Sequence, residues 1–394
     1  MNQLRDMDLA GKRVLVRVDF NVPLDDQGEV SSAVRIEAAL PTIDLILEKG
    51  GRLVLMSHLG RPKGQVVEKL RMAPVGACLA ALIERPVQLA PDCIGPETTA
   101  MAMALGDGEI LLLENLRFHA GETKGDEAFG RELASLGEVY VNDAFGTCHR
   151  AHASVAVVPR FLPSAPGLLL EKEIQAFDRV LKHPESPFVA ILGGAKVSDK
   201  LPVIESLLPK VDRLLIGGAM AYTFLKAQGI EVGQSLVEED LLDEALKVLR
   251  LAEQQGKPLL LPSDHLAAVR FAADSPYEIT GPGIPAELIG LDIGPASRKA
   301  YTEAIADART VVWNGPMGVF EMSEFRRGTE AVAEAVAACP GYTVVGGGDS
   351  VAAVELLRLQ DRIDHVSTGG GASLELLEGK TLPGIAALEK GQDS

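Results

Sequence analysis

Short apolar, strand-like runs alternate with helical stretches along the whole sequence. The runs are Arg13–Val18, Arg52–Ser57, Ile110–Glu114 and Val139–Asn142, and then Phe188–Leu192, Arg213–Gly217, Pro258–Leu261, Thr310–Asn314, Thr343–Gly346 and His365–Thr368. The stretches between them, such as Leu242–Gln254 and Thr329–Ala338, carry apolar residues at helical spacing. Strands that alternate with helices form parallel sheets covered on both faces. The alternation therefore predicts an α/β protein built on doubly wound parallel sheets.

The length of the chain predicts more than one domain. Its 394 residues exceed the roughly 250–300 that one hydrophobic core supports. A proline-rich stretch at 158–167 precedes one amphipathic helical pattern, which Pro184 and Pro187 end. We predict two Rossmann-like domains at 1–170 and 185–375, joined by an interdomain hinge helix at 171–184. Because 382–388 is apolar, we expect a final segment at 376–394 to return to the first domain.

Composition and charge exclude several classes of protein. Hydrophobic residues make up 47% and charged residues 24%, which is ordinary for a globular domain. The formal net charge of −17 argues against non-specific binding to nucleic acid or to an anionic membrane. No run of about 18 uncharged apolar residues occurs, and the first residues lack the apolar core of a signal peptide. We therefore expect a cytoplasmic protein with no membrane and no nucleic-acid partner.

The cysteines do not suggest a disulfide framework or a structural zinc site. Cys78, Cys93, Cys148 and Cys339 are scattered, with no CxxC pair. His149 and His152 follow Cys148 closely, but a zinc site needs a fourth ligand and a second spaced pair. We interpret each cysteine as a small apolar residue.

Five basic side chains lie at or just beyond the ends of strand-like runs in the first 150 residues: Arg35, His58, Arg61, Arg117 and Arg150. Ligands of open α/β sheets bind outside the carboxyl ends of the strands, so these charges are expected to converge on a small anion. Guanidinium groups suit a phosphate or a carboxylate. Taken singly, each has another interpretation, as a solvated charge, an ion pair or a structural histidine.

Asp19 and Asn21 in the string RVDFNVP follow the first run and precede a turn at Pro23. Side chains of this kind also bond local backbone amides in turns, so on their own they leave both interpretations open.

The second half carries glycines and lysines at its strand ends, in GGAKVSDK at 193–200, GGGDS at 346–350 and STGGGAS at 367–373. No GxxxxGK[ST] loop occurs, and the match to a dinucleotide fingerprint is weak. Glycines such as Gly193, Gly347 and Gly348 allow close backbone approach and phosphate contacts at helix starts, although helix caps explain any one of them. This half is expected to bind a nucleotide.

Lys196 and Lys200 are four residues apart, so we expect them on one helix face near its N-terminus with an anion between them. Asp349 is either an N-cap or a group that reaches a phosphate-bound Mg²⁺. Glu321 is a candidate for ribose hydroxyls, and Asn314 and Pro316 are expected to line the pocket.

Together these strings resemble phosphoglycerate kinases nearly end to end. The matching strings are RVDFNVP, SHLGRPKG, LLLENLRFH, VNDAFGTCHRAHAS, LGGAKVSDK, WNGPMGVFE, GGGDS and HVSTGGGASLELLEGK. Two departures are Ala33 and Val34 before Arg35, where the family usually has polar residues, and the string PSDHLAAVR. The first departure could alter how Arg35 is held.

The resemblance implies the roles of individual residues. It implies a 3-phosphoglycerate site at Asp19, Asn21, Arg35, His58, Arg61, Arg117 and Arg150, with Arg35 and Lys196 catalytic. It implies nucleotide contacts at Lys200, Gly217, Gly218, Gly290, Asn314, Pro316, Glu321, Asp349 and Ser350, with Asp349 on the Mg²⁺ side. It also implies a monomer.

The chemistry that the resemblance implies needs positioning and charge neutralisation, because phosphoryl transfer has a loose transition state. We therefore expect direct in-line transfer after closure about the 171–183 helix, which would exclude water. Two rival hypotheses are an NAD-dependent dehydrogenase, which leaves Lys196 and the basic residues unexplained, and a non-catalytic metabolite-binding module, which leaves the paired Arg35 and Lys196 unexplained.

Overall fold

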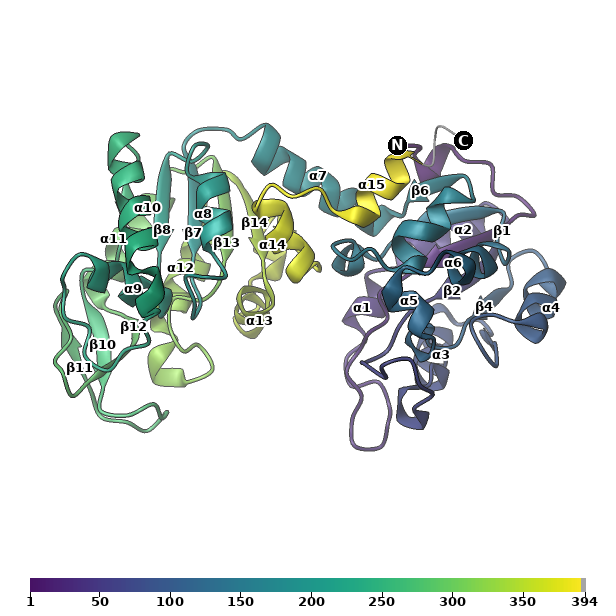
Figure 1. Ribbon diagram of the computed structural model, residues 1–394, viewed down its shortest axis with the longest axis horizontal. Coiled ribbons are helices and arrows are strands. Elements are labelled where there is room, and N and C mark those ends of the chain that lie inside the picture. Colours follow the sequence, from purple (N-terminus) through teal and green to yellow (C-terminus); the bar gives the residue numbers. More distant parts are fainter. Residues whose placement is uncertain (391–394) are drawn as a thin grey trace. The chain divides into compact units, whose positions relative to one another are not determined.

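The structure, a computed structural model, describes residues 1–390. The chain forms two compact units (Figure 1). Unit 1 is Met1–Ile174 with a segment that begins at Thr381, and unit 2 is Gln175–Lys380. Each unit contains a six-stranded parallel sheet, which confirms the predicted α/β class. Within residues 1–390, no helix is both long and apolar enough to cross a membrane.

Unit 1 is built on a sheet of strand order β3-β4-β2-β1-β5-β6. Its strands are β1 (Arg13–Arg17), β2 (Arg52–Met56), β3 (Gln88–Leu89), β4 (Ile110–Leu112), β5 (Val139–Asn142) and β6 (Ser164–Pro166). Its helices are α1 (Val34–Glu37), α2 (Leu40–Glu48), α3 (Ala73–Ile83), α4 (Pro96–Ala104), α5 (Ala120–Lys124), α6 (Glu127–Ala134) and α15 (Pro383–Lys390). Alternate residues of the central strands pack on α2 and α3 in one core, because successive side chains of a strand point to opposite faces.

Unit 2 has a parallel sheet of order β15-β14-β13-β7-β8-β9. Its strands are β7 (Phe188–Leu192), β8 (Arg213–Ile216), β9 (Leu259–Leu260), β13 (Thr310–Asn314), β14 (Tyr342–Gly346) and β15 (His365–Val366). Its helices are α8 (Leu201–Leu207), α9 (Met220–Ala227), α10 (Leu242–Gln254), α11 (Pro295–Ile305), α12 (Arg327–Ala338), α13 (Gly348–Leu356) and α14 (Gly371–Leu377). All five residues of β7 and of β13 are buried, as expected of central parallel strands.

Unit 2 also contains a three-stranded antiparallel sheet that the sequence did not reveal. Its order is β11 (Tyr277–Thr280), β10 (His265–Ala268) and β12 (Ile289–Ile293). Several predicted runs also end one or two residues late. The last residues of these runs, such as Ser57 and Glu114, lie in the loops that follow the strands at the carboxyl edge of the sheet.

The helix α7 (Leu168–Lys182) contains the point at which the two units divide. Its first backbone amides are bonded to side chains of unit 1. Leu168 N donates to Thr42 Oγ1 at 2.8 Å, and Leu169 N donates to Asp143 Oδ1 at 3.0 Å. These bonds satisfy amides that have no partner within a helix. The predicted helix at 171–184 is shifted relative to α7 by a few residues.

The segment after unit 2 packs on unit 1. Gly384 N donates to the carbonyl of Cys148 at 2.9 Å, and Leu382 and Leu388 are fully buried. A Cβ at Gly384 would lie 2.7 Å from Val155 Cγ1, so α15 packs directly against Val155 of unit 1. Of the predicted segment 376–394, residues 391–394 lie outside the described residues.

Candidate active site

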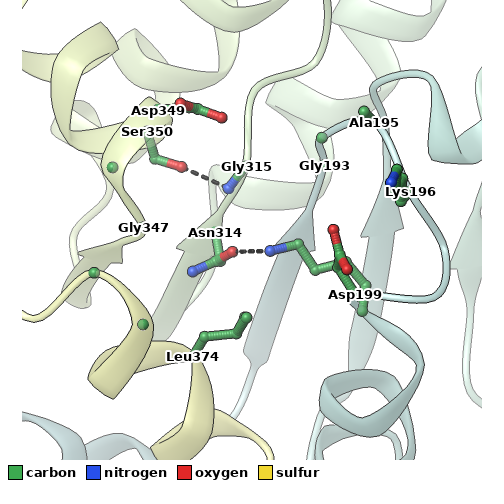
Figure 2. A pocket seen from close by; sticks show the side chains of 15 residues that line it. Gly193, Ala195, Lys196, Asp199, Asn314, Gly315, Gly347, Asp349, Ser350 and Leu374 are labelled. Atoms are coloured by element: carbon green, nitrogen blue, oxygen red, sulfur yellow. Dashed lines mark hydrogen bonds between the residues drawn. The ribbon is translucent and has the colours of Figure 1, made fainter. Parts of the chain in front are cut away.

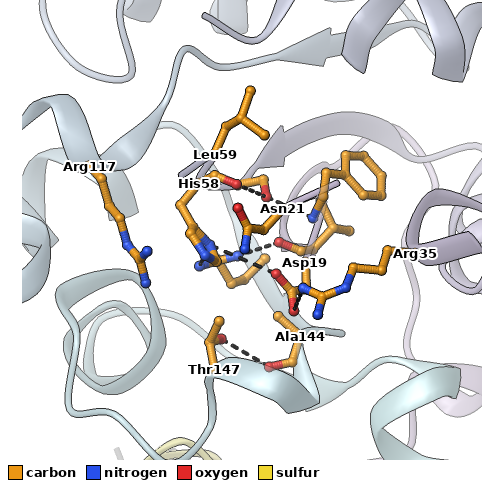
Figure 3. A network of polar contacts seen from close by, with 12 residues as sticks. Asp19, Asn21, Arg35, His58, Leu59, Arg117, Ala144 and Thr147 are labelled. Atoms are coloured by element: carbon orange, nitrogen blue, oxygen red, sulfur yellow. Dashed lines mark hydrogen bonds and ion pairs between the residues drawn. The ribbon is translucent and has the colours of Figure 1, made fainter. Parts of the chain in front are cut away.

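Unit 1 gathers charged side chains at the carboxyl ends of adjacent strands (Figure 3). Asp19 follows β1, His58 follows β2, and Arg117 lies in the short 3-10 helix Leu116–Phe118 after β4. Arg35 Nη1 donates to Asp19 Oδ2 at 3.0 Å. Arg35 keeps 43% of its side chain exposed, so this ion pair leaves much of the guanidinium accessible.

The backbone of Gly60 holds two of the predicted residues in place. Gly60 N donates to Asn21 Oδ1 at 2.8 Å, and Gly60 O accepts from Arg117 Nη1 at 2.8 Å. Gly60 has a φ of 62°, a left-handed conformation that favours glycine. The turn of SHLGRPKG therefore connects Asn21 to Arg117.

Positive charge dominates this cluster. Burial lowers the pKa of Arg117 to about 10, and the neighbouring Arg17 and Arg150 act in the same direction. Asp19 Oδ1 and Arg117 Nε are buried and have no hydrogen-bond partner among the described residues. Arg150 and Arg61 are both exposed, and Arg150 Nε donates to His149 Nε2 at 3.0 Å. The cluster thus offers cationic and polar capacity that the protein itself does not use.

Unit 2 has a cavity of about 310 Å³, and seven of the residues that line it are glycines (Figure 2). The lining includes eight of the predicted residues, namely Gly193, Lys196, Lys200, Asn314, Gly347, Gly348, Asp349 and Ser350. It also includes residues that were not predicted individually, namely Gly194, Ala195, Asp199, Gly315, Gly370, Gly371 and Leu374. The string STGGGAS, which contains Gly370 and Gly371, was the available signal for two of them.

Close backbone packing shapes the wall of this cavity. A Cβ at Gly193 would lie 2.1 Å from Pro316 O, and one at Gly218 would lie 2.5 Å from Gly194 N. Gly194 N donates to Pro316 O at 3.0 Å, and Gly218 N donates to Met317 O at 3.0 Å. Gly218 and Pro316 thus support the cavity loops from behind and are not among its lining residues.

The two lysines do not share a helix face, so that prediction was wrong. The helix α8 begins at Leu201, Lys200 is its N-cap, and Lys196 lies in the preceding loop. Pro202 stands at the start of α8, where proline is favoured, and this start leaves residues 193–199 as loop. Both side chains nevertheless line the same cavity.

Lys200 is held inside the cavity while Lys196 is exposed. Lys200 Nζ donates to Asn314 Oδ1. Burial lowers the pKa of Lys200, against the opposing effect of the carboxylates of Asp199 and Asp349. The cavity therefore pairs cations with carboxylates at its rim, a combination suited to a metal-bound phosphate.

Three other predicted nucleotide residues do not line the cavity. A Cβ at Gly290 would lie 2.2 Å from Tyr222 Oη, so this glycine serves the packing of β12. Gly217 packs on Met317, and Glu321 is exposed.

The possible zinc cluster of Cys148, His149 and His152 does not form. Among residues 1–390, the His, Cys and acidic side chains close enough to hold a metal ion are Asp92, Cys93 and His119. Hydrogen bonds account for that group, because Asp92 Oδ1 accepts from Cys93 N at 2.7 Å and lies 2.7 Å from His119 Nε2.

Known proteins resemble this chain over nearly its whole length. A family model described as phosphoglycerate kinase matches residues 4–380. A phosphoglycerate kinase of Moorella thermoacetica is 59% identical over 386 residues, with 98% of each chain covered, and one of Thermosynechococcus vestitus is 54% identical over 392 residues with the same coverage. A solved structure of phosphoglycerate kinase from Coxiella burnetii has a TM-score of 0.91 at 38% identity and covers 99% of both chains.

Proposed function

This chain belongs to the phosphoglycerate kinase family, and from that premise we propose which of its residues bind the substrates and transfer the phosphoryl group. The activity is the reversible transfer of a phosphoryl group from 1,3-bisphosphoglycerate to ADP, which gives 3-phosphoglycerate and ATP. It is a kinase reaction with a carboxyl group as the acceptor.

The unit 1 cluster is the proposed site for 3-phosphoglycerate. Its members are Asp19, Asn21, Arg35, His58, Arg61, Arg117 and Arg150. The observation that carries the proposal is the convergence of three cationic side chains in a chain of net charge −17: His58 and Arg117 follow adjacent strands, and Arg35 of α1 pairs with Asp19 after β1. An acidic protein must bind a small anion through such a local cluster. The unpartnered Arg117 Nε and the accessible part of Arg35 provide donors for phosphate and carboxylate oxygens.

The unit 2 cavity is the proposed site for the phosphates of ATP or ADP. The cavity residues Gly193, Lys196, Lys200, Asn314, Gly347, Gly348, Asp349 and Ser350 contact the nucleotide, and Gly217, Gly218, Gly290, Pro316 and Glu321 shape or border its site. Glycines let backbone amides approach phosphate oxygens closely.

Arg35 and Lys196 are the proposed catalytic residues. In a loose transition state, charge spreads over the equatorial oxygens of the migrating group, so nearby cations stabilise it. No general base is needed, because the acceptor carboxylate is already a nucleophile. Since the two ligands bind to different units, we further propose that the units close about α7 during turnover and exclude water.

Mg²⁺ is the proposed metal cofactor. The cavity offers the carboxylates of Asp199 and Asp349, which suits an ion that takes one or two carboxylates and otherwise substrate phosphates. Asp349 would hold the ion, which would supply positive charge to the phosphate oxygens when bound. We also propose that the protein acts as a cytoplasmic monomer.

A coupled assay with 3-phosphoglycerate, Mg²⁺ and ATP tests these assignments. We expect Lys196→Ala to lower kcat by about 10²–10³-fold with a smaller change in KM for ATP. Arg35→Ala should behave similarly. Lys247→Ala is the matched control, because Lys247 is an exposed lysine paired with Glu244 on α10. Near-normal turnover of Lys196→Ala would refute the proposed mechanism.

A further inference from the structure

Arg17, the last residue of β1, is a buried arginine in contact with His58, a residue of the proposed 3-phosphoglycerate site. Its side chain is completely buried. Its Nη2 lies 3.0 Å from His58 Nδ1, within hydrogen-bond distance. Arginine offers five donors and no acceptor. The contact is therefore a hydrogen bond only if His58 Nδ1 is the acceptor.

This direction fixes the protonation of the His58 ring. A nitrogen that accepts a hydrogen bond carries no proton, so the proton of neutral His58 lies on Nε2. A second proton on Nδ1 would point at the guanidinium and replace a hydrogen bond by repulsion between like charges. Arg17 thus selects one tautomer and disfavours the imidazolium.

Arg17 is itself held from behind by a buried polar chain. Its Nε donates to Ser154 Oγ at 2.9 Å, and its Nη1 donates to the carbonyl of Val18. Ser154 Oγ donates in turn to Glu122 Oε1 at 2.6 Å, and Ser154 N donates to Glu122 Oε2 at 2.9 Å. Glu122 is fully buried and supplies the opposite charge that a buried guanidinium requires. With Nε and Nη1 engaged, the guanidinium presents Nη2 to His58 in one orientation.

The other charged groups around His58 favour the same neutral state. Arg117, His152 and Arg35 all disfavour a charge on the ring, and Asp19 Oδ1, at 3.9 Å from His58 Nδ1, is the opposing carboxylate. Burial of the ring is the largest cause and Arg17 the second, and together they hold the pKa of His58 well below its usual value. Direct contact with Arg17 and near-complete burial therefore outweigh the more distant Asp19.

We propose that Arg17 is a positioning residue that holds His58 as a neutral Nε2–H donor, so that His58 binds a substrate oxygen by a directed hydrogen bond and not as a cation. The proposal rests on the assignment of His58 to the 3-phosphoglycerate site. It predicts that the affinity for 3-phosphoglycerate has no His58 titration step between about pH 5.5 and 8, around the ordinary histidine pKa.

Long-range ¹H–¹⁵N spectra of the full chain, labelled at histidine nitrogens, test the proposal directly, because they report the tautomer and the titration of each ring. His58 is assigned by its loss in His58→Gln. We expect wild-type His58 to remain the neutral Nε2–H form from pH 8 to 5.5. In Arg17→Met, His58 should become titratable closer to the ordinary pKa of about 6.5. At pH 8 that variant should bind 3-phosphoglycerate at least about tenfold more weakly, while KM for ATP stays unchanged.

Three further variants distinguish loss of the positioning role of Arg17 from a general loss of the folded structure. Arg17→Lys retains a donor and should restore much of the tautomer preference. Arg17→Met combined with Glu122→Gln removes both buried charges, so the test holds even if Arg17→Met alone fails to fold. Arg13→Met is the control on the same strand, since Arg13 pairs with the exposed Glu138 and lies at the opposite end of β1.

Two results would overturn the proposal: a wild-type His58 that is protonated on Nδ1 or titrates near pH 6.5, or an unchanged His58 spectrum in the double variant. A third result would refute the assignment of His58 to the substrate site. If the tautomer is as expected but 3-phosphoglycerate leaves the His58 resonances unmoved, the assignment of His58 to the substrate site fails and the donor role fails with it.

Discussion

Gly193→Ala should damage both the stability of unit 2 and its proposed nucleotide site. The added Cβ would lie 2.1 Å from Pro316 O and 2.6 Å from Gly315 O, whereas ordinary contacts begin near 3.4 Å. The obstructing atoms are backbone, so β7 and the loop after β13 would have to separate by about 1 Å. Two hydrogen bonds span this gap, from Gly193 N to Asn314 O and from Gly194 N to Pro316 O. At about 1–3 kcal/mol for each buried bond lost, the variant should be destabilised by about 2–6 kcal/mol.

Gly348→Ala is the matched control from the same cavity. A Cβ there meets nothing within 4 Å, and no left-handed φ is required. Gly348 is also the first residue of α13, so alanine should be neutral or stabilise the protein by up to about 1 kcal/mol.

Guanidinium unfolding followed by tryptophan fluorescence measures the difference. Trp313 is the one tryptophan of the sequence and lies buried in β13, so its fluorescence reports on unit 2. The KM for ATP of Gly193→Ala should rise at least about tenfold, because the loops that line the cavity must move. An unfolding free energy within about 0.5 kcal/mol of wild type, together with an unchanged KM, would refute the steric argument.

Three other predictions follow from the structure. His265 is fully buried, and burial lowers its pKa to about 4, so the unfolded state binds its proton more readily; stability should fall by up to about 3 kcal/mol as pH drops from about 6.5 to 4, and His265→Gln should flatten this slope in urea unfolding. A stop in place of Thr381 removes the buried Leu382 and Leu388, so the melting temperature should fall by an amount that corresponds to about 3–6 kcal/mol; unchanged melting would contradict the packing of α15. Chelation of divalent ions should abolish turnover, excess Mg²⁺ should restore it, and Asp349→Ala should raise the Mg²⁺ concentration needed; metal-independent turnover would exclude the proposed ion.

The main strands and the residues that gather in the two candidate sites could be predicted because their signals are local. A buried parallel strand reads as a short apolar run, and functional side chains follow it at the carboxyl edge of the sheet. His58 and Arg117 could therefore be found from their position after β2 and β4. The extra sheet of unit 2 could not be found in this way, since its strand HLAA has two alanines and no extended apolar pattern.

Other features depend on contacts that are distant in sequence. Arg17 alternates with valines in RVLVRV and reads as a solvent-facing position. Its burial depends on Ser154, which is 137 residues away, and on Glu122 behind it. Leu374 reaches the cavity only because α14 packs beside the loops after β13 and β14. The start of α8 depended on Pro202, which lies two residues past the second of the lysines that were used to place the helix.

Unit 2 is inserted within unit 1 in the order of the chain, since α15 follows all of unit 2 yet packs on unit 1. During synthesis on the ribosome, the inserted unit can therefore reach its native state while the unit that was begun first still lacks a helix. This reverses the usual order, in which N-terminal domains fold first. Until α15 emerges, Gly384 cannot contact Val155 and Cys148, so the surface around these two residues stays uncovered in the nascent chain.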